Sequence, residues 1–301
     1  MAIKIDGGSG KGQKYSFLFH PRDSLAENLN MAFQQVRGAL HVLRLVYVLS
    51  AIIITTLLLY PWLATSLRLG YRRGQRLVPQ LYHRILRALL GLRISVQGSP
   101  SSHRPLLVVA NHTSWLDIVV ISSFLPVVFV AQHEVASWPI FGWLAQLQRS
   151  IFVNRDRRRQ VQGTISCIAD ALTSGEVVAI FPEGTSTDGT QLFPFRSALV
   201  GAVHETLRRA AHLPAILIQP VSVAYFGTNR RLAIWAREDE IKFVPHLLQV
   251  ISLQRIDVDL AWGDPVPADM SSDRKVLTKR LEGAIRQLSA ARCQLLEGIH
   301  G

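Results

Sequence analysis

The stretch "PLLVVANHTSWLD", residues 105–117, joins an apolar run to a cluster of polar and titratable side chains. The run "PLLVVA" has the length and the β-branched content of a buried strand. Such a strand is usually followed by a glycine or proline turn, but here the chain continues into His112 and Asp117. We therefore predict a core strand whose carboxyl end carries reactive groups.

The same alternation continues along the chain. Apolar runs typical of strands lie at 105–110, 127–131, 150–154, 176–181, 215–225 and 256–263, and helical patterns lie at 114–125, 138–147, 156–174, 196–211 and 271–297. Continuous apolar runs that alternate with helices indicate a mostly parallel sheet with both faces covered. The predicted fold class is therefore α/β, a mostly parallel sheet flanked by helices, in a domain at residues 101–297.

An uncharged segment, "LVYVLSAIIITTLLLYPWL" at 45–63, precedes this domain. Its 19 residues approach the roughly 20 that a membrane-spanning helix needs, and tyrosine and tryptophan lie near its ends. We expect an N-terminal membrane-anchoring helix at 41–66, either a single span or a re-entrant anchor, with a buried core helix as the alternative. Residues 1–40 are mostly polar and are expected to form a flexible segment.

Charge is distributed unevenly in this chain of net charge +12. The stretch between Glu27 and Asp117 contains no acidic residue, and its arginines lie on both sides of the apolar segment. This arrangement fits a lipid bilayer as partner better than nucleic acid, for which no binding motif is found. Because Lys and Arg mark the cytoplasmic side, the residues after 66 are expected in the cytoplasm.

Residues 67–100 are expected to be a basic segment at the membrane surface. Within them, "VPQLYHRILRALLGLR" at 78–93 has an apolar helical face flanked by arginines. That face consists of Leu81, Ile85, Leu86, Leu89 and Leu90. Two interpretations are open, namely a basic amphipathic helix on anionic lipid and an ordinary surface helix of the domain.

Polar clusters follow three predicted strands: "NHTSWLD" after "LLVVA", "NRDRRR" after "SIFV" and "PEGTSTDG" after "VVAIF". In open α/β sheets ligands bind beyond the carboxyl ends of the strands, so the clusters predict one site. There, Asp117 can hold one imidazole nitrogen of His112, which leaves the other free to take a proton from a hydroxyl. Since no "GxSxG" serine elbow is present, the pair predicts direct attack by a substrate hydroxyl.

These motifs resemble those of the glycerolipid acyltransferase family, whose best-known members are lysophosphatidic acid acyltransferases. The family's His-x4-Asp motif corresponds to His112–Asp117, its "IFV-[DN]-R" motif to Ile151–Arg155 and its "FPEG" motif to Phe181–Gly184. Its proline-containing apolar strand corresponds to "ILIQPV" at 216–221. Order and spacing agree with the family over roughly residues 105–225.

The resemblance implies transfer of a fatty acyl group from acyl-CoA or acyl carrier protein, as co-substrate, to the hydroxyl of a lysolipid. It makes His112 the general base and Asp117 its orienting partner, and it implies neither a metal nor a bound cofactor. The residues that it places at the substrates are Asn111, Arg155, Glu183, Gly184, Thr185 and Arg196. A non-catalytic lipid-binding protein on the same fold and a lipid esterase are the alternatives.

The sequence departs from this family at one informative position. Members that use lysophosphatidic acid often have "FPEGTR", but Ser186 occupies the place of that arginine here. One guanidinium that would bind an acceptor phosphate is therefore missing. The pattern "PEGTSTDG" resembles that of acyltransferases for lyso-ornithine lipid, whose amine and carboxylate are expected to meet Asp188 and either Arg155 or Arg196.

Overall fold

A computed structural model describes residues 21–138, 141–153, 158–236 and 242–300. The chain divides into two compact units, Met1–Leu43 and Arg44–Gly301, and helix α1 (Pro21–Arg68) runs across the division. Residues 1–40 were expected to form a flexible segment, but α1 already begins at Pro21. Proline is favoured in the first turn of a helix. Residues 1–20 lie outside the described part of the chain.

Helix α1 contains the predicted anchor. Its portion Gly38–Arg68 is long and apolar enough, by length and composition, to cross a membrane. One face of this portion buries Val48 and Leu63, whereas Leu57 and Leu58 expose 67% and 72% of their surfaces. A core helix of a soluble domain would bury such side chains, so their exposure favours the membrane interpretation.

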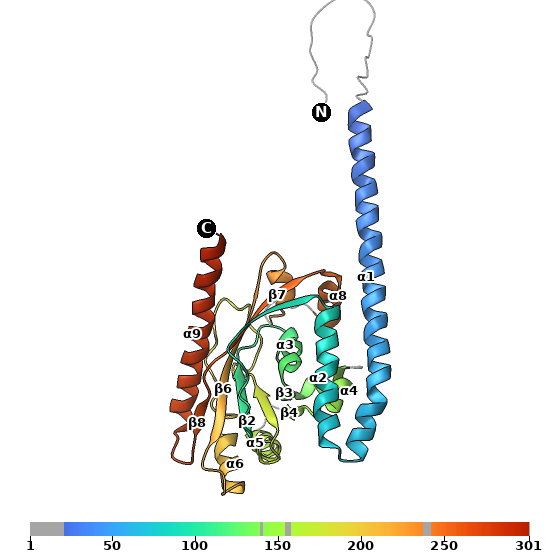
Figure 1. Cartoon of the computed structure of the whole chain (residues 1–301). Helices are drawn as coiled ribbons and strands as arrows, with labels where there is room; N and C mark the ends of the chain where they lie inside the picture. Colours follow the sequence, from blue (N-terminus) through green and yellow to red (C-terminus); the bar gives the residue numbers. More distant parts are fainter. Residues whose placement is uncertain (1–20, 139–140, 154–157, 237–241, 301) are drawn as a thin grey trace, which may run out of the picture. The chain divides into compact units, whose positions relative to one another are not determined.

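The remaining elements belong to the unit that starts at Arg44 (Figure 1). The described strands are β1 (Leu92–Gln97), β2 (Leu106–Ala110), β3 (Val128–Gln132), β4 (Ile151–Val153), β5 (Val177–Ile180), β6 (Ile216–Phe226), β7 (Ile256–Trp262) and β8 (Val266–Ala268). The described helices are α2 (Arg72–Leu89), α3 (Leu116–Phe124), the 3-10 helix η1 (His133–Ser137), α4 (Phe141–Leu147), α5 (Arg158–Thr173), α6 (Ala202–Arg209), α7 (Arg230–Ala233), α8 (Phe243–Ser252) and α9 (Arg274–His300).

The strands form one sheet in the order β1-β7-β6-β2-β5-β3-β4, with β8 paired to β6. The pairs β1/β7, β6/β2, β2/β5, β5/β3 and β3/β4 are parallel. The pairs of β6 with β7 and β8 are antiparallel. The predicted α/β fold with a mostly parallel sheet is confirmed.

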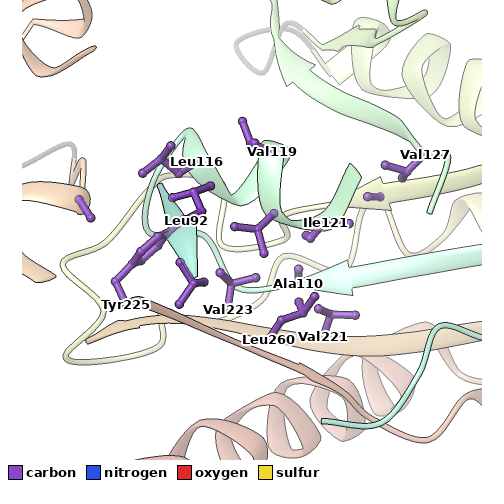
Figure 2. Close-up of a cluster of buried hydrophobic side chains, with 14 of the residues drawn as sticks. Leu92, Ala110, Leu116, Val119, Ile121, Val127, Val221, Val223, Tyr225 and Leu260 are labelled. Carbon is purple, nitrogen blue, oxygen red and sulfur yellow. The ribbon is translucent and has the colours of Figure 1, made fainter. Parts of the chain in front are cut away.

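Both faces of the sheet are buried at β2 and β5, which are buried at every position, and this explains their continuous apolar sequences. In β2, Leu106, Val108 and Ala110 belong to one core cluster, whereas Leu107 and Val109 belong to the other. The first cluster packs against α2, α3 and α8 and is seen in Figure 2; the second packs against α5, α6 and α9. Alternate side chains of one strand therefore enter opposite layers, since their Cβ atoms point to opposite faces.

Within the segment 67–100, Leu86 and Leu89 of the predicted apolar face pack against the core and Leu90 is fully buried, whereas Leu81 is 39% exposed. Contact of this face with lipid stays a prediction. The chain then enters β1, so the sheet begins at Leu92, before the boundary expected at residue 101. Helices α7 and α8 were not predicted, and the helix expected at 196–211 is shortened to Ala202–Arg209.

Candidate active site

The carboxyl ends of β2 and β5 lie side by side, because the strands are parallel neighbours with Val109 opposite Ile180. The clusters "NHTSWLD" and "PEGTSTDG" leave these two strand ends and are brought together. Strand β4, which leads to the third cluster, lies at the end of the sheet order beyond β3. Arg155 of that cluster lies outside the described residues.

His112 and Asp117 form a hydrogen-bonded pair at this edge. Nδ1 of His112 lies 2.9 Å from Oδ2 of Asp117. A carboxylate accepts hydrogen bonds, so His112 carries its proton on Nδ1 and Nε2 is the nitrogen directed away from the pair. The predicted contact between the two side chains is therefore present.

The local backbone explains how residues five positions apart meet. His112 precedes α3, and Asp117 lies in the first turn of that helix. Asp117 turns back, and its Oδ2 accepts the backbone N–H groups of Thr113 at 2.8 Å and Ser114 at 3.0 Å. These donors lie in the turn just before Trp115, the N-cap residue of α3, so the carboxylate closes this turn while it holds His112.

The two side chains differ in their access to solvent. The side chain of Asp117 is fully buried, whereas that of His112 is 23% exposed. The imidazole stacks on Phe181 with ring centroids 4.2 Å apart, and Phe181 in turn stacks on Phe129 of β3. The ring plane is thus fixed on one side by packing, and a substrate proton can reach the pair only through His112.

Tyr225 of β6 also contacts Asp117, and the sequence patterns had not singled it out. Its hydroxyl donates to Oδ1 of Asp117 at 2.7 Å. Burial, followed by the charge of Asp117, raises the pKa of Tyr225 well above its ordinary value, so the hydroxyl keeps its proton. The only signal in the sequence was a tyrosine near the end of a long apolar strand, which is also typical of ordinary core packing.

Glu183 lies beside the pair but is directed to backbone groups. Its Oε1 accepts the N–H of His112 at 2.8 Å, and its Oε2 accepts the N–H of Phe193 at 2.9 Å. The residue is only 3% exposed, and this burial raises the pKa of its carboxyl although both N–H donors act in the opposite direction. Glu183 therefore ties the loop after β5 to the loop after β2.

Asn111, expected at the substrate, is engaged by the neighbouring strand. Its Nδ2 donates to the carbonyl of Val223, and its Oδ1 accepts the N–H of Val223, both at 2.8 Å. The amide thus extends the pairing of β2 with β6 by one residue. With both polar atoms occupied and the residue buried, Asn111 holds the strand end in place.

The other expected residues lie in the loop after β5. Gly184 adopts a φ of 82°, its N–H donates to the carbonyl of Phe181, and its carbonyl accepts from Gln132. Thr185 follows in this turn and is half-buried, as is Ser186. Arg196 is exposed, and its backbone N–H donates to the carbonyl of Pro182 at 2.9 Å, which keeps it next to the "FPEG" motif.

The end of this loop approaches His112 and α7. The N–H of Thr187 donates to the carbonyl of His112 at 3.0 Å. Asp188 accepts both the N–H and the hydroxyl of Thr190, which hold the pKa of Asp188 below its ordinary value, so this carboxylate is ionised. Arg230 donates to the backbone carbonyl of Asp188 at 3.3 Å and brings a cation to the same place.

Among the described residues, no group of three or more His, Cys, Asp and Glu side chains is arranged to hold a metal ion. The chemistry available from these residues is that of an imidazole with an oriented carboxylate. Such a pair can take a proton from a hydroxyl and return it to a leaving group. The site therefore suits transfer of a group to an alcohol oxygen.

Comparison with known proteins is consistent with this geometry. Residues 93–224 match the family described as Acyltransferase. The chain is 37% identical over 256 residues to the lyso-ornithine lipid O-acyltransferase of Brucella abortus (strain 2308), which covers 82% of this chain and 94% of that protein. It is 30% identical over 218 residues to the 1-acyl-sn-glycerol-3-phosphate acyltransferase of Neisseria meningitidis serogroup B, with 71% and 81% covered.

A solved structure shares the fold. The crystal structure of the 1-acyl-sn-glycerophosphate (LPA) acyltransferase PlsC from Thermotoga maritima superimposes with a TM-score of 0.60 and 21% identity, over 85% of this chain and 97% of that one. The similarity of sequence extends over nearly the full length of the Brucella protein and includes both strand-end motifs of the site. The chain belongs to the acyltransferase family and is an acyltransferase.

Proposed function

We propose that this acyltransferase moves a fatty acyl group from a thioester donor, acyl-CoA or acyl carrier protein, to the hydroxyl of a lysolipid in membrane lipid synthesis. The observation that carries the proposal is the 2.9 Å contact between His112 Nδ1 and the buried Asp117, which leaves Nε2 as the base. The names of the relatives support a lysolipid acceptor.

The reaction follows from this geometry. Nε2 of His112 takes the proton of the acceptor hydroxyl while the oxygen attacks the thioester carbonyl. Asp117 stabilises the imidazolium that forms. The carbon–sulfur bond then breaks, and the imidazolium returns the proton to the departing thiolate, so the products are the acylated lipid and a free thiol.

Replacement of the base tests the proposal. His112→Ala should abolish acyl transfer from labelled acyl-CoA and from labelled acyl carrier protein while the protein keeps its thermal unfolding transition. His103→Ala, at an exposed histidine, serves as the matched control and should retain activity. Transfer by His112→Ala at the rate of the unaltered enzyme would eliminate the proposed base.

For the acceptor we propose lyso-ornithine lipid rather than lysophosphatidic acid. Ser186 stands where a phosphate-binding arginine is expected, and Asp188 offers an ionised carboxylate for an amine. Arg155 or Arg196 would then meet the acceptor's carboxylate. The Brucella relative carries the name of this activity, which supports the same choice.

A panel of lysolipids with labelled donor, analysed by mass spectrometry, decides the acceptor. We expect acylation of lyso-ornithine lipid, and acylation of lysophosphatidic acid alone would contradict the choice. Asp188→Asn should raise KM for lyso-ornithine lipid. Asp269→Asn is a matched control, because Asp269 likewise accepts the N–H and hydroxyl of a residue two positions on, Ser271, but lies before α9.

We also propose that the catalytic unit faces the cytoplasm at the bacterial inner membrane. The arginines that follow the apolar segment support this orientation. Cys167 is exposed and suits a labelling test in a Cys293→Ser background. A membrane-impermeant maleimide should label Cys167 in inverted vesicles and leave it unlabelled in intact spheroplasts; the reverse pattern would place the unit outside.

A further inference from the structure

The buried carboxylate of Asp117 has its two oxygens engaged unequally. Oδ2 accepts from His112 Nδ1 and from the backbone of Thr113 and Ser114, all within one short loop. Oδ1 accepts the hydroxyl of Tyr225, which is 108 positions away in the sequence, at 2.7 Å. Tyr225 thus supplies the bond from a separate strand of the sheet.

The tyrosine ring is itself held rigidly. Tyr225 is 4% exposed and lies in the core cluster with Leu92, Leu116 and Val223, as Figure 2 shows. Its backbone pairs with Val258 of β7. A hydroxyl on a ring fixed in this way can orient the carboxylate plane, since the phenol cannot move away without disturbing the core.

Resting on the proposed role of His112 as base, we propose that Tyr225 is a positioning residue, whose hydroxyl fixes Asp117 and sets the basicity of the His112–Asp117 pair. By donating to the Asp117 carboxylate, the hydroxyl reduces its effective negative charge and so weakens its attraction for the proton that His112 takes up. Tyr225 itself has no contact with substrate in this role. It acts through Asp117 on the histidine.

Among the described residues, Glu183, His246 and Tyr225 are ionisable groups that hydrogen-bond to residues 112–117. Glu183 follows β5 and has both oxygens on backbone N–H groups. Tyr225 comes from β6, and His246 from α8. His246 accepts from Trp115 at Nδ1 and donates to the carbonyl of Ile234 at Nε2. Among these groups, Tyr225 is the one bonded to the Asp117 carboxylate.

Tyr225→Phe removes the hydroxyl and keeps the ring. Loss of one donor to a buried charge should lower kcat by about 10- to 100-fold and leave the KM for the lysolipid unchanged. The imidazolium will also hold its proton more tightly, because the neighbouring carboxylate no longer accepts from the phenol and keeps more of its negative charge. The acidic limb of the kcat/KM profile should therefore move to higher pH.

Tyr82→Phe is the matched control, since Tyr82 also has a partly buried hydroxyl contact, with Thr56, but lies on α2. It should leave kcat and the pH profile unchanged. If Tyr225→Phe lowers activity equally at every pH without moving the limb, the role is packing alone and the proposal is wrong. Unchanged kcat would overturn it as well.

A second variant covers the case in which Tyr225→Phe fails to fold. Site-specific Tyr225→3-fluorotyrosine keeps the hydroxyl as a stronger donor and should move the acidic limb to lower pH; an unmoved limb would overturn the proposal. His112→Ala distinguishes a failure of the proposed base from a failure of the proposed role of Tyr225. If it is inactive while both Tyr225 variants behave as the unaltered enzyme, the base remains and only the role of Tyr225 fails.

Discussion

Glu183 accepts the backbone N–H of His112 at 2.8 Å, so the loop that leaves β5 fixes the residue that leaves β2. The distance in sequence between them is 71 positions. The resemblance to glycerolipid acyltransferases had placed Glu183 at the acceptor. In the folded protein both of its oxygens hold backbone groups, and its contribution to the site is to join two catalytic loops.

Glu183→Gln should therefore affect folding and activity together. The amide places an N–H₂ group against one of two backbone donors, so a buried N–H loses its acceptor at a cost of about 1–3 kcal/mol in the free energy of unfolding. We expect this loss in denaturant titrations and a fall in kcat, because His112 is displaced.

Glu176→Gln provides the comparison for Glu183. Glu176 is also a buried glutamate, but it precedes β5 at the opposite edge of the sheet and pairs with Arg76 and Arg149. The Glu176→Gln variant should have a lower free energy of unfolding without a matching fall in kcat per folded enzyme. Equal kcat for the two variants would contradict the role given to Glu183.

Asp117→Asn should lower kcat by roughly 10³- to 10⁴-fold with little change in KM. An asparagine that turns its amide nitrogen to the imidazole would favour the tautomer with a proton on Nε2, which cannot act as a base. Steady-state kinetics over a range of acceptor concentrations provide the measurement. Asp259→Asn, at a buried aspartate of β7, is the control. If Asp259→Asn lowers kcat as much as Asp117→Asn does, the loss reflects the replacement of any buried aspartate.

Arg44 links the start of the catalytic unit to the end of α8. Its Nε donates to the carbonyl of Ile251 at 2.9 Å, and its Nη2 donates to that of Leu253. Carbonyls at a helix end lack intrahelical partners, and a guanidinium also favours the negative end of the helix. Arg44→Ala should destabilise α8 by about 1–2 kcal/mol and speed amide hydrogen exchange in residues 243–252.

Arg72→Ala is the control for Arg44. Arg72 likewise donates to a carbonyl that follows a helix, that of Ser174 after α5, but this contact is exposed. Exchange in α8 should be unaffected. If Arg44→Ala leaves exchange in α8 at the rate of the unaltered protein, the helix end is stabilised by packing alone.

Stability should depend on pH through His83 in α2. Burial lowers the pKa of His83 to about 4 from its ordinary value of 6.5, although its bond to the carbonyl of Pro79 acts in the opposite direction. Between these values the unfolded chain binds a proton that the folded chain does not bind. The free energy of unfolding should therefore fall as pH falls from about 6.5 to about 4, by on the order of 3 kcal/mol from this group.

Unfolding in denaturant at a series of pH values in detergent checks this expectation. His83→Gln should show a shallower loss of stability over the same pH range. His103→Gln, at an exposed histidine, should keep the slope of the unaltered protein. Equal slopes for His83→Gln and the unaltered protein would show that other groups control the acid sensitivity.

The sequence by itself determined the fold class and the pairing of His112 with Asp117. Strands buried on both faces must be apolar at every position, so the run at 105–110 could be identified from its length and residue types alone. His112 and Asp117 could be paired because they are five residues apart across one strand-to-helix junction, where the chain alone limits their separation. The candidate membrane span within α1 could also be found from the sequence, because only the length and composition of one segment are needed to identify it.

The tertiary structure decided which groups complete the site. Tyr225 had the pattern of a core strand residue, and the resemblance to the family implied that Glu183 and Asn111 contact substrate. Their partners were set by strand order, which places β5 and β6 on either side of β2. A buried carboxylate or amide needs hydrogen-bond partners, and these come from whichever strands the fold places beside it. The partners of Glu183 and Asn111 are 71 and 112 positions away in the sequence, and the periodicity of apolar residues does not predict contacts at such distances.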